Sequence, residues 1–444
     1  MRISYLKQFA AFLLLLAFSA SWAVPIRALT ADPGIDVAGM DQSVKPGDDF
    51  FGYANGGWMK ATEIPADRTS FGAFDVIFDE VNKRTAGLIT DAAKSKNSEE
   101  RMVGDYYSAF LDEKAIESRG LEPVKADLAA IDAIKDKAQL STVLGSQLRA
   151  DVDPLNATNF YTDRLFGVFI SADFNNPTKN VPYLLQGGLG MPDRDNYLKT
   201  DDKNKELQEK YRAHIAAILK LANVANAEAK ASRIYDLEHK IAEAHATREE
   251  SGDVHKANNP WKLSEFATKA PGIDWANYFR AATLSDQPMV IVWHPNAVTG
   301  ISALVGSQPI DLWKEYLTFR MLDRSAGLLP KAFADENFNF YRKTLYGVPQ
   351  LAPRERRAIQ ASSNALGDVV GKMYVEKYFP PKAKTEIQTL VKNIVAAFGK
   401  RIDALTWMTP ETKAKAKAKL ATLYVGVGYP DKWRSYTGLK VTPN

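Results

Sequence analysis

The sequence predicts a mainly α-helical protein with one small β hairpin. Apolar residues recur at helical spacing through most of the 444 residues, and helix-capping residues precede several of these runs. Only the stretch between residues 165 and 186 has β-rich runs around a turn-rich segment. The chain has no repeat, no low-complexity tract and no long flexible linker, so we expect a mostly α architecture with one small β element.

The N-terminus has the pattern of a secretory signal peptide. Arg2 and Lys7 precede the apolar stretch QFAAFLLLLAFSA, and Ser21 and Ala23 occupy the small-residue positions of a cleavage site. The apolar run is short for a membrane span, although a retained anchor is the alternative. No cysteine follows it, which argues against a lipoprotein. We therefore expect export, to the periplasm or the extracellular space.

Composition excludes several classes of site and partner. The chain contains no cysteine, which rules out disulfides, thiolate nucleophiles and cysteine-bound metals. Without Arg2 and Lys7, 55 of the 57 basic residues remain against 53 acidic ones, a net charge of +2. A charge this close to balance argues against nucleic acid as a partner.

The elements that follow the N-terminus are predicted in chain order. In the stretch DDFFGYANGGWMK, Asp48 or Asp49 caps a helix that we expect to stop at Gly56 and Gly57. Apolar residues at helical spacing then begin a long helix, namely Phe74, Ile77, Phe78 and Val81. Further helices are expected near residues 98–118, 122–134 and 138–149.

The β hairpin interrupts this helical pattern. Its predicted strands, Leu165–Ala172 and Val181–Gln186, flank the turn-rich DFNNPTKN, and the loop GLGMPDRDNYL follows them. Helices then dominate from about 202 to 424. The last of these begins with Thr409 as cap and Pro410 in its first turn.

The stretch HKIAEAH raises the question of a zinc site. His239 and His245 lie six residues apart, about 240° around a helix, so one ion cannot reach both. His239 and Glu243 are four residues apart and could contact the same metal ion, but a catalytic zinc ion needs three protein ligands. His245 lies beside Ile234 and Ile241 of an apolar seam at helical spacing, so we expect it to be buried and to have no metal partner.

Other motifs also favour structural interpretations. Lysines 413, 415, 417 and 419 spread over two sides of a helix, which indicates a solvated face rather than a nucleic-acid stripe. Adjacent acidic pairs such as Asp48–Asp49 and Glu249–Glu250 are typical helix caps. The sequence contains no G-x-S-x-G nucleophile motif and no P-loop.

Seven stretches together resemble one family. They are DDFFGYANGGWMK, EIPADRTSFGAFDVI, ESRGLEPV, GLGMPDRDNYL, YRKTLYG, VGKMYVEKYF and LTWMTPETKAKAKAKL with the following VGYPDKW. In this order they resemble the M13 metallopeptidases, the neprilysin and endothelin-converting-enzyme family, from about Gly34 to the last residue. The cysteine-free chain resembles a bacterial member, since Gly47 and Asn55 occupy positions of vertebrate cysteines.

The resemblance implies a zinc enzyme whose active site lies outside this sequence. Family members hold Zn²⁺ with an H-E-x-x-H helix and a glutamate of a following E-x-x-x-D helix, after the segment that resembles VGYPDKW. The sequence ends at Asn444, before any such motif. We therefore expect no catalytic residue, no metal ligand and no cofactor in this chain, with Zn²⁺ implied for the full-length member.

The resemblance also implies a division of the chain. Residues 1–23 are expected to be the signal peptide and 24–34 a lead-in. Residues 35–72 should pack with the catalytic domain, residues 73–430 should form the helical cap domain, and 431–444 should begin the connection to the catalytic domain. For Phe50, Phe51, Tyr53 and Trp58, packing against that domain and an ordinary core cluster both remain open.

One departure from the family concerns substrate recognition. In neprilysin, two arginines of the stretch similar to TSFGAFDVIF read the C-terminal carboxylate of the substrate. Ser70 and Phe78 stand at those positions here, and Arg68 is nearby. These three residues are the candidate substrate-facing residues. Since release of dipeptides needs a charge-assisted contact to that carboxylate, and Ser70 and Phe78 do not supply one, an endopeptidase preference fits better.

The resemblance implies a substrate-gating role. The chain would be the N-terminal part of an exported zinc metalloendopeptidase, with peptide substrates and the catalytic domain as partners and no membrane span after signal cleavage. The alternative is a catalytically inactive, exported peptide-binding or scaffold protein derived from that family. An unrelated helical hydrolase would need a buried, convergent pair of carboxylates.

Overall fold

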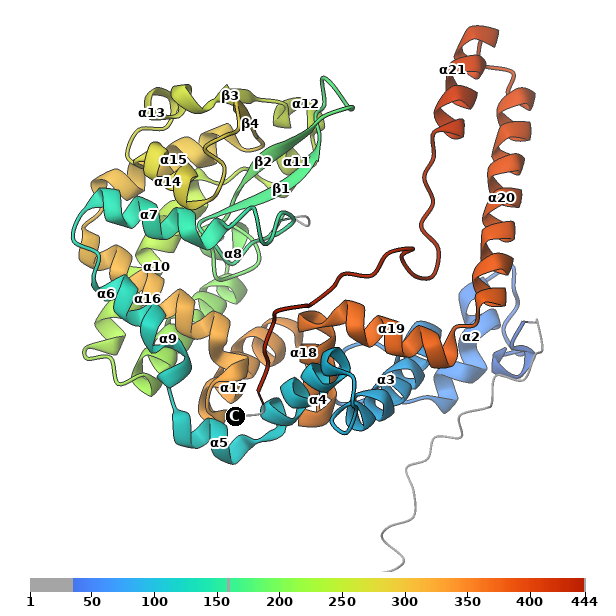
Figure 1. Ribbon diagram of the computed structural model, residues 1–444, viewed down its shortest axis with the longest axis horizontal. Coiled ribbons are helices and arrows are strands. Elements are labelled where there is room, and N and C mark those ends of the chain that lie inside the picture. Colours follow the sequence, from blue (N-terminus) through green and yellow to red (C-terminus); the bar gives the residue numbers. More distant parts are fainter. Residues whose placement is uncertain (1–34, 158–159, 443–444) are drawn as a thin grey trace, which may run out of the picture. The chain divides into compact units, whose positions relative to one another are not determined.

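The computed structural model describes residues 35–157 and 160–442, so the predicted signal peptide and lead-in lie outside the described residues. The chain divides into two compact units, Met1–Ile64 and Pro65–Asn444. The predominance of helix is confirmed (Figure 1). No helix in the described ranges is both long enough and apolar enough to cross a bilayer.

The described part of the first unit is a short 3₁₀ turn, η1 (Val37–Gly39), and the helix α2 (Phe50–Ala61). The predicted cap is confirmed, because the Asp49 carboxylate accepts a hydrogen bond from the Gly52 amide at 2.8 Å. The predicted stop at Gly56 and Gly57 is wrong, since α2 continues through both to Ala61. A Cβ on Gly57 would lie only 2.7 Å from the Met40 carbonyl oxygen, so this glycine permits close packing of the helix.

The second unit begins with a series of helices. Before the sheet these are α3 (Ala73–Ala92), α4 (Ser98–Leu111), α5 (Glu113–Arg119), η2 (Glu122–Val124), α6 (Lys125–Asp132) and α7 (Lys137–Leu148). The helices predicted near 98–118, 122–134 and 138–149 are therefore present. The first of them is divided at Asp112, whose carboxylate caps α5 by accepting from the Ala115 amide at 2.9 Å.

The predicted hairpin is confirmed as the first part of a larger sheet. Strands β1 (Phe166–Ala172) and β2 (Asn180–Gln186) pair antiparallel, with Phe166 opposite Gln186. Two further strands, β3 (Pro260–Lys262) and β4 (Met289–Val292), complete a mixed sheet of order β1-β2-β4-β3, with β2 and β4 parallel. These two strands were missed because three or four residues are too few to show alternation.

Helices continue through the remainder of the unit. Around β3 and β4 lie α8 (Asp195–Leu198), α9 (Asp202–Leu221), α10 (Ala227–Ala244), α11 (Arg248–Ser251), α12 (Val254–Ala257), η3 (Leu263–Glu265), α13 (Phe266–Lys269), α14 (Trp275–Ala281), α15 (Pro295–Ser307) and α16 (Ile310–Ser325). After them come η4 (Ala326–Leu328), α17 (Lys331–Phe338), the π-helix η5 (Asn339–Thr344), α18 (Arg354–Ala365), α19 (Gly367–Tyr378), α20 (Pro381–Ala404) and α21 (Pro410–Ala421).

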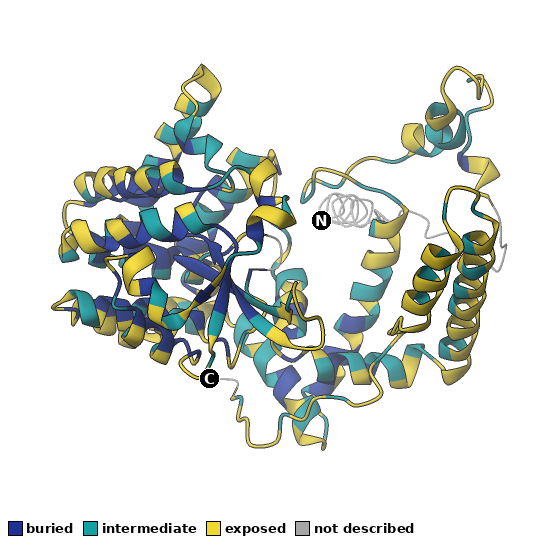
Figure 2. Cartoon of the chain, turned by 90° about the horizontal axis from the view of Figure 1, so that it is seen from above, coloured by how far each residue is buried: buried dark blue, intermediate teal, exposed yellow. Residues whose placement is uncertain are grey.

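Among the described residues, buried apolar side chains form a main core and two smaller clusters. Figure 2 colours the buried residues dark blue. The main core draws on α6, α7, α9, α10, α14, α15, α16 and the inner face of β1 and β2. A second cluster joins α3 and α4 to α18 and α19, and Tyr436 and Val441 pack against it. The region predicted as one helical domain, 73–430, therefore contains more than one core.

The last two helices, like α2 and α5, lie outside the cores. Neither α20 nor α21 contains a buried residue, and α20 exposes a stripe of large apolar residues at helical spacing. The stripe consists of Ile387, Leu390, Ile394 and Phe398. The predicted cap of α21 is confirmed, because the Thr409 hydroxyl accepts from the Thr412 amide at 3.2 Å.

Candidate functional site: the charged cluster at the start of α3

The three candidate substrate-facing residues lie on and around the loop that precedes α3. Arg68 belongs to the loop and its side chain is only 13% exposed. Ser70 is exposed on the same loop, and Phe78 is 46% exposed on the second turn of α3. The three residues are thus neighbours in the sequence, but Ser70 and Phe78 are exposed whereas Arg68 is mostly buried.

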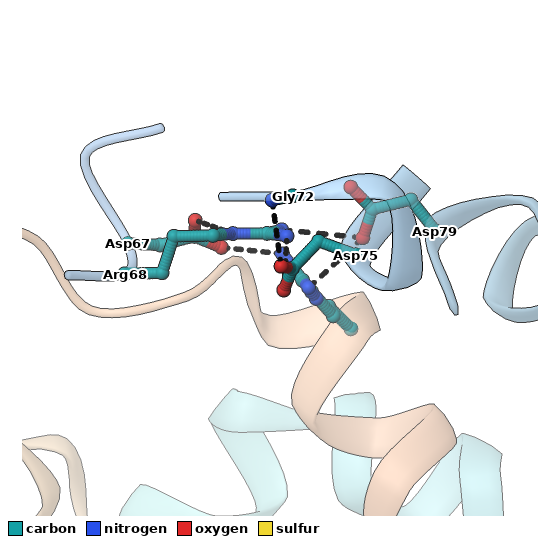
Figure 3. Close-up of polar contacts among 6 residues, drawn as sticks. Asp67, Arg68, Gly72, Asp75 and Asp79 are labelled. Atoms are coloured by element: carbon teal, nitrogen blue, oxygen red, sulfur yellow. Dashed lines mark hydrogen bonds and ion pairs between the residues drawn. The ribbon is translucent and has the colours of Figure 1, made fainter. Parts of the chain in front are cut away.

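The guanidinium of Arg68 is surrounded by carboxylates (Figure 3). Its Nε lies 3.2 Å from Asp67 Oδ1, its Nη2 lies 3.2 Å from Asp79 Oδ1, and its Nη1 lies 3.5 Å from Asp75 Oδ1. The guanidinium carbon also lies 5.3 Å from the centre of the Phe71 ring, within range of a cation–π contact. A substrate carboxylate at Arg68 would therefore have to compete with three aspartates.

A second arginine completes what we call the charged cluster, defined as Asp67, Arg68, Asp75, Asp79 and Arg356. Arg356, from the first turn of α18, places Nη1 2.6 Å from Asp67 Oδ2 and Nη2 3.0 Å from Asp79 Oδ1. Both arginines thus bridge the same two aspartates, one on the loop and one on α3. The charged cluster fastens the loop and the start of α3 to α18.

Hydrogen bonds that involve the backbone hold the same loop at both ends. The Gln350 amide donates to the Ala66 carbonyl at 3.0 Å, just before α18. At the other end, the Gly72 amide donates to Asp75 Oδ2 at 2.9 Å, so this carboxylate closes the N-terminus of α3. The loop between residues 65 and 72 is therefore fixed in position rather than loosely attached.

The first two turns of α3 carry an exposed apolar surface beside the charged cluster. Four large side chains are more than 40% exposed there: Phe74 at 88%, Val76 at 41%, Ile77 at 50% and Phe78 at 46%. The later turns of the same helix bury Leu88, Ile89 and Ala92 in the second core cluster. One helix thus ends in a core and begins with an uncovered apolar surface.

The histidines of HKIAEAH are placed as structural residues. His245 follows the last turn of α10, is 9% exposed, and lies with Nε2 2.8 Å from the Gly187 carbonyl oxygen. Its predicted burial is confirmed. His239 lies 3.6 Å from Glu243 on the outside of the same helix. In residues 35–157 and 160–442, no three His, Asp or Glu side chains are grouped closely enough to hold a metal ion.

A serine–histidine pair escaped the sequence analysis because 43 residues separate its members. His294 Nε2 lies 2.9 Å from Ser251 Oγ, and the Gln186 amide donates to His294 Nδ1 at 3.2 Å. Because Nδ1 accepts, Nε2 carries the hydrogen and donates to Ser251, whose hydroxyl in turn donates to the Thr247 carbonyl. This direction is the reverse of what a nucleophilic serine needs, so the pair is structural.

A buried glutamate network was also invisible in the sequence. Oε2 of Glu238 accepts from Tyr197 Oη at 2.6 Å, from Tyr211 Oη at 2.9 Å and from the Gly190 amide at 3.1 Å. Burial raises the pKa of this carboxyl group. The network anchors the loop GLGMPDRDNYL to α9 and α10.

Comparison with known proteins decides the family. The N-terminal model of peptidase family M13 matches residues 46–430. The chain belongs to peptidase family M13. Human endothelin-converting enzyme 1 is 26% identical over 410 residues, which are 89% of the M13 chain and 52% of that enzyme. The chain thus spans about half the length of the curated relatives it matches.

Solved structures agree with this assignment. The Mycobacterium tuberculosis zinc metalloprotease Zmp1, crystallised with an inhibitor, is 33% identical, with a TM-score of 0.83 over 92% of the M13 chain and 61% of Zmp1. PepO from Lactobacillus rhamnosis, at 20% identity and a TM-score of 0.73, shares the fold over 88% of the chain. The family uses zinc, but the described residues of this chain offer no group that fits the ion.

Proposed function

We propose that this chain is the substrate-gating part of a zinc-dependent metalloendopeptidase that acts on peptides. The observation that carries the proposal is the match of the N-terminal family model to residues 46–430, in a chain that spans about half of its relatives. The catalytic half of such an enzyme supplies the zinc site. This chain contributes the helical surfaces that limit entry to peptides.

Uncovered apolar surfaces support a large partner. Phe50 and Phe51 on α2 are 69% and 65% exposed, and α3 and α20 carry the apolar surfaces described above. Apolar patches of this kind on a folded chain are typical of interaction sites. In the proposal, the catalytic half covers them, and residues 35–72 pack on its side.

The charged cluster supports an endopeptidase preference. Arg68 is the only arginine of the loop between residues 65 and 72, and three aspartates already neutralise it. Ser70 and Phe78 offer a hydroxyl and a ring, which do not provide a charge-assisted contact to a terminal carboxylate. We propose that Arg68 shapes this substrate-facing loop rather than reading the end of the peptide.

The test joins this chain to the catalytic half of M. tuberculosis Zmp1 at the matching end. The fused protein should bind zinc and cleave a nonapeptide with blocked termini, whereas casein should remain intact because the gate excludes it. The unfused chain should do neither and should bind no stoichiometric zinc by elemental analysis. Casein cleavage by the fused protein, or one tightly held zinc ion in the unfused chain, would contradict the proposal.

The alternative function is an inactive peptide-binding or scaffold protein. Sequencing the coding DNA beyond codon 444 distinguishes it from the peptidase. An H-E-x-x-H motif within one domain's length after codon 444 favours the peptidase. Its absence in every reading frame favours the scaffold.

Export is part of the proposal and has its own test. The signal pattern of Arg2, Lys7, Ser21 and Ala23 places cleavage after about Ala23, since these residues match the charged and small-residue positions of a leader. Mass spectrometry of the mature protein should find a new N-terminus near residue 24 in the exported fraction. Recovery of intact Met1 in the cytoplasmic fraction would count against export.

A further inference from the structure

A cavity of about 610 Å³ opens beside the end of β2, away from the charged cluster in sequence. Among the described residues, its lining comes from residues 160–162, from residues 186–194 at the end of β2 and the start of the loop GLGMPDRDNYL, from residues 245–252 after α10, and from residues 341–346. The last segment includes part of the π-helix η5, a helix type that often occurs at functional sites. The cavity volume is within the range of ligand pockets.

Aromatic side chains form the mouth of this cavity. Phe160 is 45% exposed, Tyr161 is 50% exposed and Tyr346 is 55% exposed. Deeper in, Leu189 and Met191 are 6% and 0% exposed and extend the apolar lining. The mouth thus presents exposed, flat aromatic rings that a ligand can cover.

The polar groups of the floor are fixed by hydrogen bonds within the chain. Gln186 Oε1 accepts from the Ala246 amide at 2.8 Å, and its Nε2 donates to the Ala246 carbonyl at 3.1 Å. The Tyr341 hydroxyl donates to Asp323 Oδ2 at 2.7 Å. Since His245 and Gly190 are held in the same way, the floor is preformed, which lowers the entropic cost of binding.

Charge at the cavity is modestly positive. Among the described lining residues, Arg194 and Arg248 are basic and Asp193 is acidic, and Asp193 Oδ2 lies 3.2 Å from Arg248 Nη2. The Arg248 side chain is 83% exposed and can turn toward a ligand. Burial lowers the pKa of His245 to about 4, so this histidine adds no charge near neutral pH. The balance of one positive charge favours a ligand with a carboxylate.

We infer that this cavity is a binding site for a peptide segment in which an aromatic side chain adjoins a carboxylate. The ring enters between Phe160, Tyr161 and Tyr346, and the carboxylate lies toward Arg194 and Arg248. The inference rests on the proposed function for its ligand class, a peptide. The cavity would be a second contact for the peptide, outside the catalytic half, and would select among the peptides that enter the enzyme.

The test measures fluorescence anisotropy of the full chain with the peptide fluorescein-Gly-Gly-Glu-Phe-Glu-Gly-amide. The peptide should bind saturably, and exchange of its phenylalanine for alanine, or of both glutamates for glutamines, should weaken binding at least tenfold. Tyr346→Ala and Arg248→Ala should each weaken binding at least fivefold. Tyr424→Ala, an 89% exposed residue outside the cavity lining, and Arg101→Ala, an exposed arginine, should leave it unchanged.

Each outcome decides the inference separately from the proposed function. Binding that survives Tyr346→Ala and Arg248→Ala, or equal affinity for the alanine-containing peptide, would place the ligand elsewhere. Absence of saturable binding would also overturn the site, while hydrolysis by the fused protein would still stand. Circular dichroism and thermal unfolding of each variant should match the parent chain, because the replaced side chains are largely exposed.

Discussion

At the scale of residues, the charged cluster shows how contacts distant in sequence define a short loop. Asp67 and Asp79 each receive contacts from Arg68 and Arg356, and Arg356 comes from a helix 277 residues after Asp79. The Asp67 side chain is 13% exposed and that of Arg356 is 30% exposed. Removing one partner from such a partly buried pair costs more than removing one from an exposed pair, because the charge left behind is poorly solvated.

Replacement of Arg356 tests the energetic role of the charged cluster. Arg356→Ala should lower the free energy of unfolding by about 1–2 kcal/mol, because Asp67 and Asp79 lose a shared partner in a partly buried position. The control Lys415→Ala removes an ion pair with Glu411 in which both side chains are 78% exposed, and should cost less than about 0.5 kcal/mol. Urea unfolding measures the free energy of both variants. Equal losses in Arg356→Ala and Lys415→Ala would show that the charged cluster stabilises the fold no more than an exposed ion pair.

A second prediction concerns the buried His245. Burial lowers its pKa in the folded chain to about 4, against 6.5 for the free side chain. Between these pH values the unfolded chain binds a proton that the folded chain does not, so stability falls as pH decreases from about 6.5 to 4. His245→Gln, which retains a donor for the Gly187 carbonyl, should remove up to about 3 kcal/mol of this pH-dependent loss.

The measurement is a series of urea unfolding curves from pH 7 to pH 4 for parent and variant. His214 remains in both proteins, and the difference between the two curves reports the loss of His245 together with its effect on His294, whose low pKa is caused by burial and by the charge of His245. A constant difference at every pH would mean that His245 titrates normally in the folded chain.

At the scale of elements, α2 illustrates how packing overrides a stop signal. Gly56 and Gly57 are poor helix formers, yet α2 passes through them because the turn η1 lies against this face. A Cβ on Gly57 would meet the Met40 and Gly39 carbonyl oxygens at 2.7 Å and 3.0 Å. The pair of glycines thus marks a close contact rather than a terminus.

Paired glycine substitutions test this interpretation. Gly57→Ala should disrupt the packing of η1 on α2 by about 1–3 kcal/mol, seen as faster hydrogen exchange of the amides in residues 50–61. Gly87→Ala, at an exposed position within α3 where a Cβ meets nothing within 4 Å, should instead stabilise the chain by about 0.5–1 kcal/mol. Unchanged exchange in Gly57→Ala would show that η1 moves aside at little cost.

At the scale of the whole molecule, burial and hydrogen bonding divide residues 35–72, which were expected to pack with the catalytic domain, into two parts. The first compact unit ends at Ile64, and its helix α2 contains no buried residue. Residues 65–72, in contrast, are bonded to α18 and to its preceding loop within the second unit. We therefore expect residues 35–64 to depend on the catalytic half more strongly than residues 65–72.

Hydrogen exchange on the mature chain and on the Zmp1 fusion tests this expectation. Amides of residues 35–64 should exchange quickly in the chain alone and more slowly, by at least tenfold, in the fused protein, because apolar surface of α2 becomes covered. Amides of residues 65–72 should change less. Equal protection of residues 35–64 in both proteins would show that this unit is stable by itself.

The sequence by itself determined the helical class, the hairpin, the Asp49 and Thr409 caps, the burial of His245 and the family resemblance. These features depend on periodicity, capping and ordered motifs, all of which are local or cumulative along the chain. The family assignment confirms the resemblance over residues 46–430.

Only the tertiary structure decided which distant side chains meet. The contact of Arg356 with Asp67, the reversed Ser251–His294 pair, the two short strands and the cavity mouth all join segments that lie far apart in sequence. No local pattern encodes such meetings, because they depend on how helices pack around the sheet and on which polar groups must find partners once buried. For the same reason Arg68, an ordinary loop arginine in the sequence, lies among three aspartates in the fold.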